Sequence, residues 1–456
     1  MNTTASPPAH KTFLGEPRAL AYLAFTEAWE RFSYYGMTAL LVLYMSRSLL
    51  LPGHVENIRG FASFRAGIEG VFGPLSTTAL ASQIYGLYTG FIYFTPVLGG
   101  WIADRWMGAR NAVVLGALLM SAGHIAMAFD ASFLLALTLL IVGCGFLKGN
   151  ISNQVGSLYP QDDGAARTRG YAIYSFGINV GAVAGPLLCG LLAQMYGWHA
   201  GFGLASILML IGACTYLAGY SNFTASVRTA PVQKTSQPLT RAQWRVIIAL
   251  IAVMALTMFH SVAYYQNTDA AMVWIDRSVN LNLLGFHIPA AWFNSIDPFV
   301  SMMAVPVLLA FWRWQAKRKR EPDEVIKIGL GAWIACAANL ILVLGCATMN
   351  PVPAIVPFLY DVLLGVGFLY YWPTMLALVS REAPPRLKGT LMGSVFLSLF
   401  VSNFVIGWLG TFFERMTPLH FWALHTAIAA TGGILIFALS APLARVFNAQ
   451  SSSDRS

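Results

Sequence analysis

Charged residues are scarce in this sequence, and their scarcity excludes most soluble folds. Only 10% of the 456 residues are Asp, Glu, Lys or Arg, whereas 57% are apolar. A soluble globular domain has about 25% charged residues, which cover its surface. We therefore expect lipid to be the solvent of this chain. The net charge of +9 does not indicate nucleic-acid binding, because the basic residues stand in short segments beside apolar runs.

The sequence also lacks the motifs of hydrolases, phosphate-binding enzymes and metal sites. It contains no HExxH motif, no GxSxG elbow and no phosphate-cradling glycine loop. Its cysteines lie inside apolar runs without CxxC spacing, which excludes a zinc site and a disulfide framework. Residues 1–20 are polar and contain Pro, so no cleaved signal peptide is predicted. We predict no enzyme activity, no metal and no cofactor, with a proton gradient as the energy source.

Long apolar segments are abundant. A membrane-spanning helix needs about 20 mostly apolar residues, and by that measure we count about twelve segments. They are residues 20–48, 78–103, 111–129, 132–157, 170–195, 199–220, 243–275, 289–314, 326–347, 352–380, 388–412 and 418–444. The predicted fold is an all-α membrane protein of about twelve transmembrane helices.

Basic residues are unevenly divided between the two sets of loops. One set contains Arg105, Arg110, Arg167, Arg169, Arg228, Lys234, Arg241, Arg245, Lys317, Arg318, Lys319, Arg320, Lys327, Arg381, Arg386 and Lys388. The other set contains Arg47, Arg59, Arg65, Arg277 and Arg415. Because cytoplasmic loops carry the excess of Lys and Arg, both termini are predicted to be cytoplasmic. The predicted location is the cytoplasmic (inner) membrane.

A polar segment near mid-chain divides the predicted spans into two groups. Residues 221–242 form the longest polar break between helices. We predict an N-terminal six-helix bundle over 1–220, a cytoplasmic linker over 221–242 and a C-terminal six-helix bundle over 243–456. This six-plus-six arrangement is typical of major facilitator transporters, whose solute site lies between the halves near the bilayer midplane. No strong internal repeat is visible, so the prediction depends on the layout alone.

Three charged residues stand within the first predicted span. Glu27, Glu30 and Arg31 are spaced i, i+3 and i+4, so they share one helix face, and Tyr34 and Tyr35 follow one turn later. A charged group at mid-membrane costs about 2.5–3.5 kcal/mol, so three together need partners and a reason. One interpretation is a structural ion-pair cluster at a helix junction. The other is a functional site, in which a glutamate changes protonation when its cation is diverted.

This charged segment resembles a motif of a known transporter family. Residues 27–36 match the ExxERFxYYG motif of the proton-coupled oligopeptide transporters. Residues 104–110 resemble the family's loop between spans two and three, residues 147–152 its fourth-span segment with a lysine, and residues 177–182 the core of its fifth-span signature. The resemblance covers most of the chain and is clearest in the first half.

The resemblance implies proton-coupled symport of di- and tripeptides by alternating access, in a fold that works as a monomer. It assigns proton coupling to Glu27, Glu30, Arg31 and Lys148, with Lys148 pairing with the two glutamates in competition with Arg31. It assigns peptide binding to Arg31, Lys148, Tyr34, Tyr35, Tyr93 and Asn179. The implied partners are a small peptide, protons and the lipid bilayer. Lys148 can instead be a snorkelling lysine, and Tyr93 a packing residue.

The second half departs from the family pattern. Tyr265 stands where the family has a seventh-span glutamate before Gln266, and Phe368 and Trp372 replace a tenth-span glutamate and serine. Since the tenth-span carboxylate is expected to hold the peptide amine, an alternative substrate is a modified or anionic peptide-like solute without a free amine. Asp297 and Asp269 are candidates to compensate, or else helix-cap or interface residues. The predicted substrate contacts of this half are Tyr265, Gln266, Asp297, Phe368 and Trp372.

Overall fold

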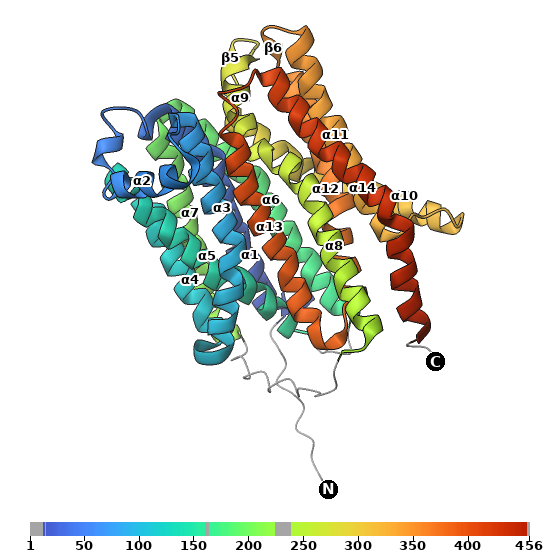
Figure 1. The fold of residues 1–456 in the computed structure, drawn as a ribbon. Coiled ribbons are helices and arrows are strands. Elements are labelled where there is room, and N and C mark those ends of the chain that lie inside the picture. Colours follow the sequence, from blue (N-terminus) through green and yellow to red (C-terminus); the bar gives the residue numbers. More distant parts are fainter. Residues whose placement is uncertain (1–11, 14, 160–163, 224–238, 454–456) are drawn as a thin grey trace.

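The structure is a computed structural model, and it describes residues 12–13, 15–159, 164–223 and 239–453. Figure 1 shows a bundle of long helices with short strands and loops at its ends. Elements before residue 224 are β1 (Thr12–Phe13), β2 (Glu16–Pro17), α1 (Arg18–Tyr44), α2 (Phe61–Phe72), α3 (Thr77–Ile102), α4 (Gly108–Ala126), α5 (Phe133–Ser157), α6 (Gly164–Tyr196) and α7 (Trp198–Gly219).

The second half begins with α8, whose first turn is fixed by a capping box. Thr240 accepts a hydrogen bond from the backbone of Gln243, whose side chain in turn accepts one from the Thr240 backbone. The elements are α8 (Arg241–Tyr264), α9 (Ala270–Ser278), β3 (Val279–Asn280), β4 (Asn282–Leu283), β5 (Phe286–His287), α10 (Ile296–Lys317), α11 (Glu324–Thr348), β6 (Val352–Pro353), α12 (Ile355–Glu382), α13 (Lys388–Gly410) and α14 (Pro418–Ser453).

The prediction of about twelve spans is confirmed. Within the described residues, ten segments are long and apolar enough to cross a membrane, and one of them, Thr77–Ala126, contains both α3 and α4. The remaining long helix is α1, of 27 residues, whose hydropathy is lowered by Glu27, Glu30 and Arg31 near its middle. Burying these charges is acceptable only where protein, and not lipid, surrounds them.

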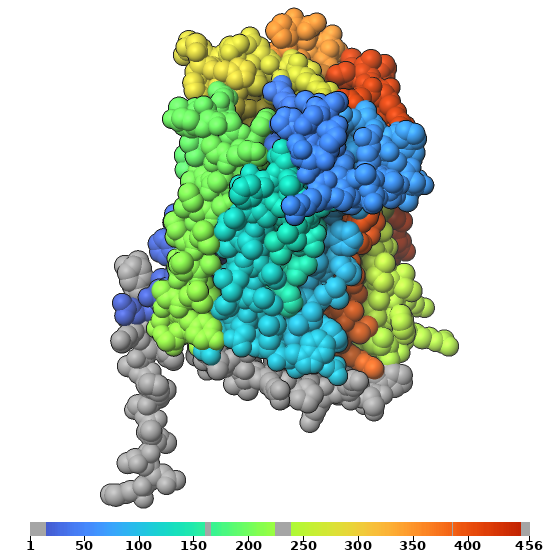
Figure 2. Space-filling model, turned by 90° about the vertical axis from the view of Figure 1, so that its left-hand side faces the viewer, coloured from blue at the N-terminus to red at the C-terminus, as the bar shows by residue number. Residues whose placement is uncertain are grey.

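Two features differ from the sequence prediction. The seventh span was predicted over 243–275, but α8 ends at Tyr264 and a 3-10 turn over Tyr265–Thr268 separates it from α9. The polar run that follows Tyr265 supplies side chains that compete for backbone groups, as the Thr268 hydroxyl does by donating to the Tyr265 carbonyl at 3.0 Å. The second feature is the short helix α2, which buries only Phe61 and Ile68 and whose blue segment lies on the surface in the upper part of the view in Figure 2.

Helices pack mainly with helices of the same half of the chain. In the first half α1 packs on α6 and α7, and in the second α11 packs on α12 and α14. Figure 1 shows α4, α5 and α7 on one side of the view and α10, α11 and α14 on the other. Between them α3 packs against α13. The predicted domain boundaries stay a prediction, and most of the 221–242 linker lies outside the described residues.

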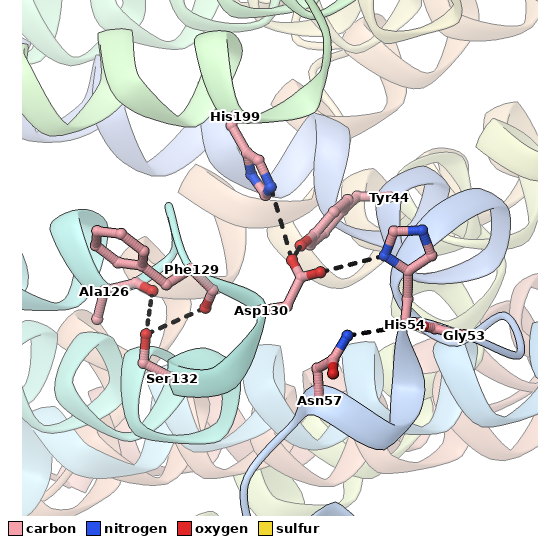
Figure 3. Close-up of polar contacts among 9 residues, drawn as sticks. All are labelled: Tyr44, Gly53, His54, Asn57, Ala126, Phe129, Asp130, Ser132 and His199. Atoms are coloured by element: carbon pink, nitrogen blue, oxygen red, sulfur yellow. Dashed lines mark hydrogen bonds and ion pairs between the residues drawn. The ribbon is translucent and has the colours of Figure 1, made fainter.

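Loops meet at the end of the bundle where α1 ends and α3 begins, which we call the distal end. Figure 3 shows Asp130 at its centre, between Tyr44, His54 and His199. The Tyr44 hydroxyl donates to Asp130 Oδ1 at 2.6 Å, and the His54 Nδ1 and His199 Nε2 atoms lie 3.3 and 3.6 Å from its carboxylate. Asp130 therefore joins the end of α1, the loop that follows it and the start of α7.

Polar contacts also join the two halves at the distal end. Arg277 lies 3.0 Å from Glu414 and donates to the Thr78 hydroxyl at 2.8 Å. Thr78, at the start of α3, donates to the same Glu414 carboxylate at 2.6 Å. An ion pair links Arg47 to Asp276 nearby. These contacts close the distal ends of the two halves against each other.

Candidate substrate and proton site

The charged cluster of α1 is buried and internally paired. Glu27, Glu30 and Arg31 are 3%, 0% and 4% exposed. The Arg31 Nε atom lies 3.1 Å from Glu27 Oε1 and also forms an ion pair with Glu30. Two carboxylates thus share one guanidinium, so the predicted clustering on one helix face is present in the structure.

Several polar atoms of this cluster remain unsatisfied. Within the described residues, Arg31 Nη2, Glu27 Oε2 and Glu30 Oε1 are buried without a hydrogen-bond partner. Leaving such groups unpaired in a low-dielectric interior costs about 1–3 kcal/mol each, and more when they are charged. The cluster therefore has a free donor and free acceptors for a further ligand or proton.

Lys148 lies near this cluster but is not paired with it. Its ammonium group on α5 lies 4.7 Å from the centre of the Tyr93 ring, and its charge acts on Glu30. It forms no ion pair within the part of the chain that the structure describes. The implied pairing of Lys148 with the glutamates is therefore not formed here, because Arg31 contacts both carboxylates itself.

The position of the cluster is set by small residues on α6. A Cβ atom at Gly181 would lie 2.3 Å from the Ala28 carbonyl and 2.9 Å from the Arg31 Cβ, and one at Gly185 would lie 2.4 Å from the Phe32 carbonyl. Glycines four residues apart let two membrane helices approach closely. The fifth-span signature therefore acts partly by packing α6 on α1. Asn179, half-buried, lies two residues before Gly181 and so faces away from that contact.

Aromatic side chains connect the cluster with the second half. Tyr34 and Tyr35 meet edge-on at 5.1 Å between ring centres. The ring centre of Tyr93 lies 6.4 Å from that of Tyr265, the residue that replaces the seventh-span glutamate. The ring centres of Tyr265 and Tyr264 are 4.8 Å apart. The structure thus brings Tyr93 and Tyr265 together, one from each half.

Carboxylates stand at the far end of this aromatic series. Asp297, 7% exposed, accepts a hydrogen bond from the Tyr264 hydroxyl and another from Ser301 Oγ at 3.2 Å. Its charge reaches Tyr35 of α1. Phe368 stacks on the Tyr264 ring at 5.7 Å. The predicted residues Asp297 and Phe368 therefore both contact Tyr264.

Sequence reasoning missed Asp361. This residue of α12 is 1% exposed, and its Oδ2 atom has no hydrogen-bond partner among the described residues. The charge of Asp297 acts on it, and Ser301 joins the same two helices by donating to the Gly365 carbonyl at 2.9 Å. The signal that could have found it is simple, because a lone carboxylate inside an apolar span needs a function or a partner.

Two predicted substrate residues lie apart from this group. Gln266 is fully buried and donates through Nε2 to the Ile406 carbonyl of α13 at 3.1 Å. Trp372 meets Phe396 of α13 edge-on at 5.6 Å. Both side chains therefore pack on α13 in this structure. Among the described residues no group of three or more His, Cys, Asp or Glu side chains is placed to hold a metal ion.

This fold and site define a membrane transporter of the major facilitator type. The Major Facilitator Superfamily matches residues 31–407, and the chain belongs to this superfamily. Within it, the chain is a proton-coupled oligopeptide transporter, as the first-span motif indicated, and its relatives support this assignment over nearly the whole chain.

Similar proteins carry related names. The chain is 28% identical to a di-/tripeptide transporter of Lactococcus lactis subsp. cremoris, over 96% of this chain and 97% of that protein. It is 27% identical to the peptide transporter YePEPT of Yersinia enterocolitica, over 98% of each. It superimposes on a peptide transporter POT in complex with alafosfalin with a TM-score of 0.84 and 26% identity, over 96% and 97% of the two chains.

Proposed function

We propose that the protein carries di- and tripeptides across the cytoplasmic membrane together with protons, by alternating access. The observation that carries this proposal is that the cations of the site stand in the first half of the chain, whereas the carboxylates of the second half have no ion-pair partner among the described residues. The cations Arg31 and Lys148 stand in the first half, and the carboxylates Asp297 and Asp361 stand in the second, with aromatic side chains between them. A peptide with a free carboxylate and a free amine has the complementary charges.

The peptide carboxylate binds at Arg31 and Lys148. Arg31 has a free guanidinium nitrogen, and a guanidinium binds a carboxylate through two parallel hydrogen bonds. Tyr34 and Tyr35 are placed one turn beyond Arg31 to support the peptide, and Tyr93 lies beneath the Lys148 ammonium. Asn179 is proposed to bind the peptide backbone from α6.

The peptide amine binds at Asp297. This carboxylate accepts from two hydroxyl groups and forms no ion pair within the described part of the chain, so an incoming ammonium group is the partner that its charge lacks. Tyr265 and Phe368 line the space between the two charged ends. The named peptide transporters among the relatives favour this reading over the amine-less solute that the missing glutamates suggested.

Proton coupling follows from the shared guanidinium. When a peptide carboxylate binds Arg31, the guanidinium is drawn away from one of the two glutamates, Glu27 or Glu30. A buried carboxylate that has lost its cation takes up a proton. The neutral cluster then permits the two halves to rock, and release of peptide and proton restores the ion pairs. In this cycle the distal end faces the outside, both termini are cytoplasmic, and the bundles 1–220 and 243–456 move about the linker 221–242 in a single monomer.

Uptake into liposomes tests this function. We expect labelled dialanine to accumulate only with an inward proton gradient. Replacing Glu30→Gln is expected to abolish accumulation and to retain exchange of dialanine across the membrane, because the variant mimics the protonated cluster. Glu69→Gln is the matched control, since Glu69 pairs with Arg65 on the exposed helix α2 and takes no part in the site. Gradient-driven uptake by Glu30→Gln at the normal level would refute the coupling scheme.

A further inference from the structure

A buried carboxylate outside the peptide site stands where the seventh span is interrupted. Asp269 lies between the 3-10 turn Tyr265–Thr268 and α9 and is 0% exposed. Both of its carboxylate oxygens lack a hydrogen-bond partner within the described residues. In membrane transporters, interrupted helices with buried acidic groups are where coupling ions bind.

Asp269 points into the seam between α3 and α13, which join the two halves of the protein. A Cβ atom placed on Gly410 of α13 would lie 2.6 Å from Asp269 Oδ2 and 2.9 Å from Ser82 Oγ of α3. The three elements therefore meet without room for a methyl group. One turn farther along the seam, a Cβ on Gly86 would lie 2.7 Å from the Cα of Gly407, so the contact between α3 and α13 is close over several turns.

Among the described residues, no cation forms an ion pair with the Asp269 carboxylate. The groups that face it are the Ser82 hydroxyl and the phenol of Tyr85 on α3, and α13 presents Gly410. Its neighbours along the chain, Asn267 and Thr268, are neutral. Toward the distal end, Arg277 and Glu414 form an ion pair with each other at 3.0 Å.

Closing the seam over a charged carboxylate is costly. An ionised group moved from water to a dry interior without a partner loses many kilocalories of hydration, and in practice it is neutralised instead. A protonated carboxyl group is different, because it can donate to a neighbouring oxygen such as Ser82 Oγ. The closed seam seen here is therefore compatible with a neutral Asp269 and not with a charged one.

We infer that Asp269 is a proton-binding gate residue, which must take up a proton from the outer medium before α3 and α13 can close the distal side. This inference depends on the proposed function, since it assigns a second protonation step to the same transport cycle. When the distal side opens, α3 separates from α13 and the carboxylate regains water. Peptide entry then stalls in the open state until a proton arrives.

The pH dependence of peptide exchange tests this role. Exchange of labelled dialanine against internal dialanine requires opening and closing but no net proton gradient. With internal pH constant, exchange by Glu30→Gln, whose α1 cluster is already neutral, should fall as external pH rises, by about tenfold per pH unit once the proton of Asp269 is no longer bound. The double variant Glu30→Gln/Asp269→Asn imitates the protonated Asp269 side chain as well, so its exchange should stay high at alkaline pH. Asn267→Ser in the same Glu30→Gln background removes no titratable group and should keep the profile of Glu30→Gln.

The outcomes separate the two proposals. Absence of dialanine exchange in the wild type refutes the proposed function, whereas an alkaline fall that is identical in Glu30→Gln and in the double variant refutes only the gate. Should Asp269→Asn not purify as a monodisperse protein, Asp269→Ser replaces it. A folded neutral variant that has lost exchange at every pH overturns the inference, which requires the neutral side chain to permit closure.

Discussion

Replacing Asp297→Asn tests the amine end of the proposed peptide site with little change of shape. The amide oxygen can still accept from Tyr264 and Ser301, which donate to the carboxylate in the native protein. The substitution removes only the negative charge. The matching change in the ligand is N-acetylation of dialanine, which removes the positive charge of the amine.

The expected magnitude follows from the loss of one charged hydrogen bond. Such a bond contributes about 1.5–3 kcal/mol, and about 1.4 kcal/mol corresponds to tenfold in affinity. Wild-type protein should therefore bind dialanine about 10- to 150-fold more tightly than its acetylated form. In Asp297→Asn this ratio should be smaller by about the same factor, because the charge that distinguished the ligands is gone. The size of the acetyl group affects the ratio equally in both proteins and therefore cancels when the two ratios are compared.

Competition against labelled dialanine in exchange-active liposomes measures both ratios. Asp323→Asn is a matched control: it also removes one carboxylate, but at the exposed N-cap of α11, where Asp323 accepts from the Ile326 backbone at 2.8 Å. It should keep the wild-type ratio. If Asp297→Asn weakens both ligands equally, Asp297 does not hold the amine. If the wild type binds acetylated dialanine as well as dialanine, the substrate is a solute without a free amine.

Two further predictions concern stability in detergent. Gly181→Ala should lower the midpoint of thermal unfolding, because its Cβ would meet the Ala28 carbonyl at 2.3 Å and overpacking costs about 1–3 kcal/mol. The control is Gly203→Ala on α7, where a Cβ has nothing within 4 Å and the midpoint should not fall. Equal effects of the two substitutions would refute the packing role of Gly181. Burial raises the pKa of Glu414, but hydrogen bonds from Ser76, Thr78 and Arg277 outweigh it and hold that pKa below its ordinary 4.5. The distal contact is therefore fully present above pH 4.5 and is lost as pH falls through the lower native value. Glu414→Gln should thus unfold at lower temperature than wild type at neutral pH, and this difference should vanish in strong acid.

The helices and the first charged cluster could be predicted because their signals are local. Long apolar runs define spans whatever surrounds them, and Glu27, Glu30 and Arg31 share a face because of their spacing alone. Their burial and pairing in the structure agree with that expectation. The functional roles of these residues stay predictions, because spacing and burial do not by themselves identify a ligand.

What could not be predicted depends on contacts between distant segments. The end of α8 at Tyr264 has no proline or glycine signal, and the interruption is supported by Gln266, which bonds to α13 rather than lining the site. Asp269 and Asp361 are buried by helices from other parts of the chain. These are α3 and α13 for Asp269 and α10 for Asp361. Spacing along one helix carries no information about which neighbour covers a side chain.

The positions of the second-half carboxylates suggest a division of tasks. Asp269, Asp297 and Asp361 are all buried without an ion-pair partner within the described residues, and each such charge is costly in a membrane. Stability alone does not account for three of them, since apolar residues of similar volume would serve as well or better. Asp297 and Asp361 lie on α10 and α12, which Ser301 joins beside the aromatic series that leads to Arg31, whereas Asp269 faces the seam that closes the distal side. A change in amine recognition should therefore leave the alkaline limit of exchange unaltered, and a change at the gate should leave the preference for a free amine unaltered.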